Sequence, residues 1–157
     1  MAKKKVLFVC LGNICRSPLA EAVFKHKVKA KGLDHLFEID SCGTGNYHIG
    51  DPPDPRTIAN AKKNGVVIEH LGRQLCDDDL AYFDVILAMD NKNLRSIHSL
   101  RTAEEYLHKV KLMREFDPSE KGEVPDPYYG EEKNFQEVFD ILNRTADALL
   151  EELIAKK

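Results

Sequence analysis

The stretch VLFVCLGNICRSPLAEAVF, residues 6–24, decides the fold of this chain. It continues an apolar run, Lys5–Cys10, whose β-branched and aromatic residues are typical of a strand that is covered on both faces. A short segment with one glycine and one asparagine follows, and then Ser17 and Pro18 provide an N-cap and a first-turn proline. The stretch therefore predicts a strand, a tight loop and a helix in direct succession, and the helix should end near Gly32.

The rest of the chain alternates between apolar segments of strand length and amphipathic segments of helix length. We expect strands at Phe37–Ser41, Val85–Met89 and Val110–Met113, with Val66–Ile68 as a short strand or the approach to one. We expect helices from Asp54-Pro55 to Asn64-Gly65 and over Asp77–Phe83, Asn91–Ser99 and Asn134–Ala155, and a surface loop over Asp117–Glu132. This alternation predicts one α/β domain over residues 1–157, a mostly parallel sheet between two layers of helices joined by right-handed crossovers.

The composition limits the classes of function. A chain of 157 residues that is 43% hydrophobic fits one globular domain with a sizeable core. The net charge is only -3, with acidic and basic residues interspersed, so neither nucleic acid nor an anionic membrane is an expected partner. The apolar run after MAKKK is too short for a signal peptide and no run has membrane-spanning length, which predicts a cytoplasmic protein. The cysteines at positions 10, 15, 42 and 76 are few for a secreted disulfide scaffold and are expected to be free thiols.

The loop after the first strand is the expected site of chemistry. Ligands of open parallel sheets bind outside the carboxyl ends of the strands, and this loop leaves the strand at that end and enters a helix N-terminus. Its N–H groups and the helix dipole would attract an anion and stabilise the thiolate form of Cys10, which makes Cys10 a nucleophile. Arg16 adds a planar fork that matches two oxygens of a tetrahedral oxyanion, and the Ser17 hydroxyl could either donate to the thiolate or cap the helix. The spacing alone is a weak pattern, but its place between a strand and a helix predicts a nucleophile and an anion cradle in one loop.

The residues of this loop and of several later blocks resemble a known family. CLGNICRSPLAEAVF, at residues 10–24, is similar to the low-molecular-weight protein tyrosine phosphatases, and the likeness extends along nearly the whole chain. The further matching blocks are IDSCGT at 39–44, PPDPR at 52–56, His70 ahead of GRQ, FDVILAMDNKNLR at 83–95 and DPYYG at 126–130. The resemblance implies a four-stranded parallel sheet flanked by helices on both faces. It also implies hydrolysis of phosphotyrosine and aryl phosphates through a phosphocysteine intermediate, without a metal or other cofactor, and acid phosphatase activity as well.

The resemblance also implies roles for residues. Cys10 is the expected nucleophile, Arg16 holds the phosphoryl oxygens, and Asp126 matches the general acid that protonates the leaving phenolate. The expected phosphate-binding residues are Leu11, Gly12, Asn13, Ile14, Cys15, Arg16 and Ser17. The expected substrate pocket, a slot that suits a flat phenyl ring better than the shorter phosphoserine, consists of Leu11, Ile14, Tyr47, Tyr128 and Tyr129. The residues expected to support the loop by hydrogen bonds are Asn13, Ser17, Ser41 and His70.

The expected partners follow from the same resemblance. They are tyrosine-phosphorylated proteins or peptides, with phosphate and other tetrahedral oxyanions as inhibitors. The five histidines other than His70 show no ligand spacing and are expected at the surface. Cys10 and Cys15 could be half of a metal site, but no second pair has zinc spacing. In the family, the second loop cysteine forms a reversible disulfide with the nucleophile and protects it from over-oxidation, which here implies a redox-sensitive enzyme.

Three other interpretations use the same loop. Arsenate reductases share the nucleophilic loop and pass a disulfide through further cysteines, for which Cys42 and Cys76 are candidates, but these lack the close spacing of that family. A phosphotyrosine-binding module without turnover would not need both Cys10 and Asp126. Protein arginine phosphatases resemble the loop but usually carry Thr where this chain has Ile14, and the apolar Ile favours an aryl phosphate.

Overall fold

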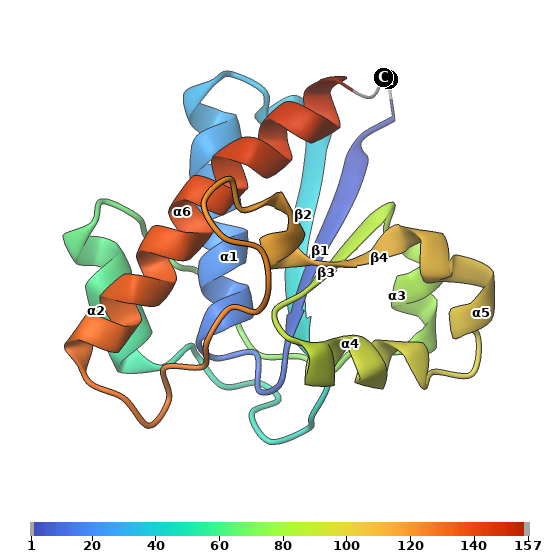
Figure 1. Cartoon of the computed structure of the whole chain (residues 1–157), viewed down its shortest axis with the longest axis horizontal. Coiled ribbons are helices and arrows are strands. Elements are labelled where there is room, and N and C mark those ends of the chain that lie inside the picture. The colour runs from blue at the N-terminus through green and yellow to red at the C-terminus, as the bar shows by residue number, and fades with distance from the viewer. Residues whose placement is uncertain (1, 156–157) are drawn as a thin grey trace.

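Four parallel strands form the centre of the molecule (Figure 1). The computed structural model describes residues 2–155 and gives the strand order β2-β1-β3-β4. The strands are β1 (Lys4–Cys10), β2 (Phe37–Gly43), β3 (Val85–Ala88) and β4 (Val110–Leu112). β1 pairs with β2 over its whole length, from Lys4 opposite Phe37 to Cys10 opposite Gly43, and with β3 on its other side. The expected four-stranded parallel sheet is confirmed.

Helices cover both faces of the sheet (Figure 1). One face carries α1 (Arg16–Ala30), α2 (Pro55–Lys63) and α6 (Glu132–Ala155), and the other carries α3 (Asp77–Tyr82), α4 (Asn91–His98) and α5 (Ala103–Tyr106). Three 3₁₀ segments complete the connections: η1 (Asp34–Leu36), η2 (Leu107–Lys109) and η3 (Met113–Phe116). Among the helices of residues 2–155, none is both long enough and apolar enough to cross a membrane.

The residues of β1 divide between two hydrophobic cores because successive side chains of a strand point to opposite faces. Val6 and Phe8 pack with α1 and α6, whereas Leu7 and Val9 pack with residues of α3, α4 and α5. All four side chains are fully buried, which is why the strand has a continuous apolar sequence instead of an alternating one. Cys10 ends the strand in the core on the α1 side.

The start of α1 differs from the prediction. We expected Ser17 to cap the helix, but α1 begins at Arg16, and Cys15 occupies the N-cap position without a side-chain hydrogen bond. The Ser17 hydroxyl instead lies 2.9 Å from Cys10 Sγ and accepts a hydrogen bond of 2.8 Å from Asn13 Nδ2. Because the Ser17 side chain points towards the end of β1, it does not cap the helix, and the first N–H groups of α1 remain available to another acceptor.

Two further differences concern short elements. Residues 66–68 form no strand; Val66 and Ile68 pack into the core from an irregular segment, while the outer edge of β2 makes one bridge, from Gly43 to Gln74. Helix α5 was not predicted, because a helix of this length is too short to show a periodic pattern. The predicted start of α2 is confirmed: the Asp54 carboxylate caps the helix and accepts from the Arg56 N–H at 2.8 Å.

Candidate active site

The Cys10 loop, residues 10–17, joins the end of β1 to the first turn of α1. The Thr44 N–H donates to the Cys10 carbonyl and the Gly45 N–H to the Leu11 carbonyl, both at 2.9 Å. Gly43 lies so close that a Cβ there would be 2.7 Å from the Leu11 carbonyl oxygen, which requires glycine. Within residues 2–155, the N–H groups of residues 11–17 have no backbone acceptor. Consecutive free N–H groups at a helix N-terminus form a cradle for an anion.

Asn13 holds the loop in its shape. Its φ of 58° lies in the left-handed region, which asparagine tolerates better than most residues, and its side chain is buried. Its Nδ2 donates to Ser17 Oγ at 2.8 Å and to Ser41 Oγ at 3.0 Å. Its Oδ1 accepts from the Arg73 N–H at 3.1 Å and lies 2.6 Å from His70 Nε2. The four predicted supporting residues therefore form one hydrogen-bonded group around Asn13.

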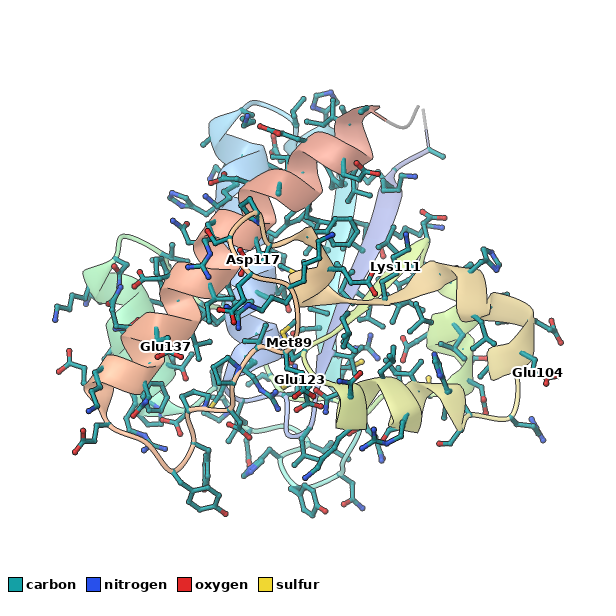
Figure 2. All side chains as sticks on the ribbon, viewed as in Figure 1. Met89, Glu104, Lys111, Asp117, Glu123 and Glu137 are labelled. Carbon is teal, nitrogen blue, oxygen red and sulfur yellow. The ribbon has the colours of Figure 1, made fainter. Side chains whose placement is uncertain are left out.

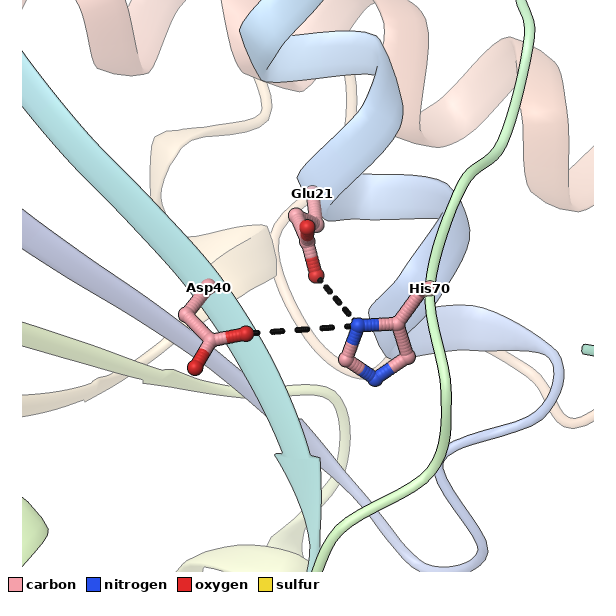
Figure 3. Close-up of side chains that lie close together, drawn as sticks. All are labelled: Glu21, Asp40 and His70. Atoms are coloured by element: carbon pink, nitrogen blue, oxygen red, sulfur yellow. Dashed lines mark ion pairs between the residues drawn. The ribbon is translucent and has the colours of Figure 1, made fainter. Parts of the chain in front are cut away.

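Glu21 of α1 extends this group behind the loop (Figure 3). Its Oε1 accepts from Ser41 Oγ at 2.6 Å and lies 3.2 Å from His70 Nδ1. Burial alone would raise the pKa of Glu21, but hydrogen bonds from His70, Lys25 and Ser41 outweigh burial and lower the pKa. Glu21 was not among the predicted residues; in the structure it is a carboxylate among the buried residues of α1, where it requires polar partners.

Glu21, Asp40 and His70 also bring three metal-ligand atoms within 4.8 Å of one another (Figure 3). Each of these side chains already has protein partners. Lys25 pairs with Glu21, Arg73 Nε donates to Asp40 Oδ2 at 2.9 Å, and Nε2 of His70 faces Asn13. Because two cations neutralise the two carboxylates, the group fits a structural hydrogen-bond network better than a cation site.

Arg16 links the Cys10 loop to Asp90, Val124 and Asp126. Its side chain is 3% exposed, and Nη1 donates to Asp90 Oδ2 at 2.8 Å and to the Val124 carbonyl at 3.0 Å. Its Nη2 lies 3.7 Å from Asp126 Oδ2. Burial alone would lower the pKa of Arg16, but the negative charges of Cys10, Asp90 and Asp126 outweigh it and raise the pKa, so the guanidinium stays charged. Asp90 was not among the predicted residues; its position directly after the β3 strand was the available signal.

A pocket of about 380 Å³ brings the predicted catalytic residues together. Its lining includes Cys10, Arg16 and Asp126, from three distant parts of the sequence. The five predicted substrate-pocket residues all line it, as Leu11, Ile14, Tyr47, Tyr128 and Tyr129. The Asp126 carboxylate is 45% exposed and accepts from the Tyr128 N–H at 3.1 Å, so a substrate can reach it. The predicted Asn13, Ser17, Ser41 and His70 lie behind the pocket, not in its lining.

His48 lines the same pocket, although sequence reasoning predicted for it only a place at the surface. A Cβ on Gly12 would lie 3.2 Å from His48 Cδ2, so the ring packs against the loop at the one residue without a side chain. Its Nδ1 lies 3.2 Å from Asp51 Oδ2. No sequence signal pointed to His48, because its position depends on how the segment after β2 folds back over the loop.

The three thiols other than Cys10 lie in different environments. The four cysteines are free, as predicted. Burial, and after it the negative charge of Asp54, raise the pKa of Cys15 to about 12. Cys42 is fully buried in the core on the α3 side, and burial raises its pKa well above the usual value. Cys76 is exposed and caps α3, with Sγ 3.5 Å from Asp79 Oδ2. Neither Cys42 nor Cys76 lines the pocket, which disfavours a disulfide relay from Cys10.

Comparison with known proteins agrees with this geometry. The family model of the low molecular weight phosphotyrosine protein phosphatases matches residues 5–157. The chain belongs to this family. The low molecular weight phosphotyrosine protein phosphatase of Schizosaccharomyces pombe is 49% identical over 137 residues, which cover 86% of this chain and 87% of the relative. That of Gallus gallus is 44% identical over 149 residues, 94% of each chain.

A solved structure of a protein tyrosine phosphatase is also similar to this chain. The crystal structure of a protein tyrosine phosphatase from Entamoeba histolytica, with Hepes in its active site, has a TM-score of 0.93 and 40% identity to this chain. It covers 98% of each of the two chains. The chain is a low-molecular-weight protein tyrosine phosphatase, its substrates carry phosphotyrosine, and the expectation from the sequence is confirmed for both fold and activity.

Proposed function

We propose that Cys10 is the nucleophile of this phosphatase and that Arg16 and the N–H groups of the Cys10 loop hold the phosphoryl group. The observation that carries the proposal is the shared pocket of Cys10, Arg16 and Asp126. Cys10 Sγ attacks phosphorus in line, the S–P bond forms, and the P–O bond to the aryl group breaks. The loop N–H groups of residues 11–17 and the fork of Arg16 stabilise the charge on the equatorial oxygens. Asp126 gives its proton to the departing phenolate.

The second step returns the enzyme to its starting state. The Asp126 carboxylate takes a proton from water, the water oxygen attacks phosphorus, and the S–P bond of the phosphocysteine breaks. The thiolate that leaves lies 2.9 Å from the Ser17 hydroxyl, which can donate a hydrogen bond to it. The proton that Asp126 takes from water in this step is the one it donates to the leaving group in the next cycle, which couples the two steps.

We extend the proposal to the substrate. Leu11, Ile14 and the tyrosines of the pocket form an apolar rim around a charged floor, which suits the flat ring of phosphotyrosine in a protein or peptide. Tyr129 is 96% exposed and Tyr128 37%, so both are available to a bound peptide. Phosphate and other tetrahedral oxyanions should bind the cradle as inhibitors; the Entamoeba relative holds Hepes, a sulfonate, in its active site. We place this single domain, residues 1–157, in the cytoplasm, with no nucleic acid or membrane as partner.

The proposal is tested with a Cys10→Ser variant and a substrate panel. Cys10→Ser should lose turnover of p-nitrophenyl phosphate by at least about 10⁴-fold, because no thiolate remains, while it still binds inorganic phosphate. Wild-type turnover in the variant would contradict covalent catalysis by this sulfur. Phosphotyrosine, phosphoserine and phosphoarginine peptides at mildly acidic pH should rank with phosphotyrosine first. A preference for phosphoarginine, or arsenate-dependent oxidation of thioredoxin, would favour the alternative reactions.

A further inference from the structure

A buried charge lies outside the lining of the pocket. Asp117, which follows η3, is 3% exposed. Arg144 of α6 donates to both of its oxygens, Nε to Oδ1 at 2.9 Å and Nη2 to Oδ2 at 3.0 Å. Arg114 of η3 donates from Nε to Oδ2 at 2.9 Å, and the Ser119 N–H donates to Oδ1 at 2.8 Å. The carboxylate thus has partners on every side, and two arginines from separate elements converge on it.

The charge of Asp117 is permanent under the conditions in which the enzyme works. Burial alone would raise the pKa of Asp117, but the hydrogen bonds from Arg144, Ser119 and Arg114 outweigh burial and hold the pKa well below its usual range. A permanent carboxylate fixes the planar guanidinium of each arginine in one orientation.

Arg114 also contacts residues further along the chain, and its Nη2 lies 3.2 Å from Glu120 Oε2. Arg114 Nη1 donates to the Glu123 carbonyl at 2.9 Å, and the Glu123 carboxylate accepts from the Asn91 N–H at 2.7 Å. The Val124 N–H donates to the Met89 carbonyl at 2.8 Å. Figure 2 shows Asp117 beside α6, with Met89 and Glu123 closer to α4. Arg114 therefore connects the charge at Asp117 to the point where the chain returns to the end of β3.

The same backbone contacts the catalytic residues. The Val124 carbonyl accepts from Arg16 Nη1 at 3.0 Å, and Asp126 follows two residues later. We propose that Asp117 and Arg114 are positioning residues: they fix the Glu123 carbonyl, and through it the Val124 carbonyl against Arg16 and the Asp126 carboxyl over the pocket. This inference rests on the roles proposed above for Arg16 and Asp126.

The segment that carries Asp126 needs positioning contacts because it is long and irregular. Residues 117–131, the Asp126 loop, contain no helix or strand. A catalytic group carried by such a loop loses its alignment easily, and a misplacement of about 1 Å costs about 100-fold in rate. The Cys10 loop has β1 and α1 on either side. The Asp126 loop is instead held before Asp126 by these contacts, by Arg114 Nη2 at 3.2 Å from Glu120 Oε2, and by the buried side chain of Val124.

The two arginines offer a matched pair of variants. Arg114→Ala and Arg144→Ala each remove a cation from Asp117, but only Arg114→Ala removes the contact with Glu123. The rates are measured with aryl phosphates of differing leaving-group pKa, together with inhibition by inorganic phosphate and the thermal midpoint. Arg114→Ala should lower kcat by about 10-fold to 100-fold for poor leaving groups and weaken phosphate inhibition several-fold. Arg144→Ala should lower the thermal midpoint at least as much and change kcat by less than about threefold.

Other outcomes overturn the inference. If the two variants lower kcat equally, or if Arg114→Ala lowers only the thermal midpoint, the cluster stabilises the fold without positioning the site. Arg114→Lys covers the case in which Arg114→Ala does not fold. One ammonium cannot reach both Asp117 and Glu123 in the way the fork does, so Arg114→Lys should retain part of the defect; full wild-type kinetics would contradict us. Asp126→Ala is run in parallel: no leaving-group dependence there would refute the proposed acid itself, and not the positioning of it.

Discussion

The two loops that meet at the pocket are held by different kinds of contact. The Cys10 loop is fixed by short side chains in a buried hydrogen-bond group centred on Asn13, with β1 before it and α1 after it. The Asp126 loop is fixed by ion pairs and backbone contacts from α6, η3 and the end of β3. The first loop is therefore held between two regular elements and by a buried side-chain group, whereas the second contains no helix or strand and depends on arginine contacts and on its backbone contact with the end of β3.

This difference fits the tasks of the two loops. The cradle must keep its N–H groups aimed at one tetrahedral anion through both steps, so it benefits from attachment to a strand and a helix. The acid must be close to a leaving group that later departs, and its carboxylate is accordingly 45% exposed. Changes in the two loops should separate the effect on phosphate binding from the effect on the leaving group.

The largest effect is expected from Asp126→Ala. Loss of the acid should lower kcat by about 10²–10⁴-fold for aryl phosphates with poor leaving groups and much less for good ones, because only the former need a proton as they depart. Inorganic phosphate should still bind, since the cradle is intact. Asp126→Asn is the matched variant. Its amide oxygen can still accept from the Tyr128 N–H, but it has no acid proton, so it should show the same dependence on the leaving group. A uniform loss across the series of leaving groups would show that Asp126 is not the acid.

A smaller effect is expected from Asn13. Asn13→Gly keeps the left-handed backbone, with φ at 58°, but removes the side-chain hydrogen bonds. We expect kcat to fall about 10-fold to 100-fold through misalignment of the cradle, and the free energy of unfolding to fall by about 1–3 kcal/mol. Asn13→Ala should be less stable than Asn13→Gly by a further ~1 kcal/mol, because alanine tolerates this backbone poorly. Urea unfolding measures the stability of both variants, and assays with an aryl phosphate measure kcat. Equal stability of Asn13→Gly and Asn13→Ala would contradict a strained backbone at this position.

The sequence predicted the Cys10 loop better than the Asp126 loop for the same physical reason. The order of strand, loop and helix depends on patterns within 20 residues, so the site at Cys10 and Arg16 could be argued from chemistry alone. From the sequence, Ser17 could either cap the helix, because a serine before proline satisfies that pattern locally, or donate to the Cys10 thiolate. In the structure its hydroxyl lies beside Cys10, across the loop. Asp126 could be assigned only through the resemblance to a family.

The residues that sequence reasoning missed act through contacts between different elements of the fold. Arg16 is held by Asp90, Asn13 is linked through His70 to Glu21, and Arg114 contacts Glu123 only because the chain folds back across the end of the sheet. Hydrophobic periodicity describes which face of an element is buried, but it carries no information about which polar groups meet there. Such pairings become visible only when the sheet order is known.

A weaker effect on turnover, but a clear one on stability, is expected from Asp117→Asn. Because the pKa of Asp117 is lowered in the folded state, its ion pairs stabilise the protein above the unfolded-state pKa, near 4, and this contribution is lost as the pH falls below that value. The stability difference between wild type and Asp117→Asn should thus be largest near neutral pH, at about 3 kcal/mol, and shrink towards pH 3.

Thermal midpoints of wild type and Asp117→Asn, measured from pH 3 to pH 7, test whether the stability difference shrinks as the pH falls. Glu132→Gln is the control, because Glu132 pairs with Lys63 at 3.1 Å and both side chains are exposed, at 73% and 69%. Exposed pairs contribute little, so this variant should follow the wild-type curve closely. A difference for Asp117→Asn that does not change with pH would mean that the carboxylate charge is unimportant.

The smallest change in turnover is expected from Cys15, and its effect should be on recovery from oxidation. With a pKa raised to about 12, Cys15 is a thiol at neutral pH and does not compete with Cys10 for the phosphoryl group. Peroxide converts the Cys10 thiolate to a sulfenic acid, and condensation with the Cys15 thiol forms a disulfide and releases water. Both cysteines line the same pocket. The bridge would keep Cys10 from further, irreversible oxidation.

The measurement is the fraction of each protein's own starting activity that dithiothreitol restores after mild peroxide treatment. Wild type should regain most of its activity, whereas Cys15→Ser should regain only a small part, because its sulfenic acid has no partner and oxidises further. Cys76→Ser is the matched control, since Cys76 is exposed on α3 and lies outside the pocket; it should recover as wild type does. Equal recovery of Cys15→Ser and wild type would mean that no bridge forms, and the rigidity of the Cys10 loop, with Cys15 buried at its N-cap, would then be the reason.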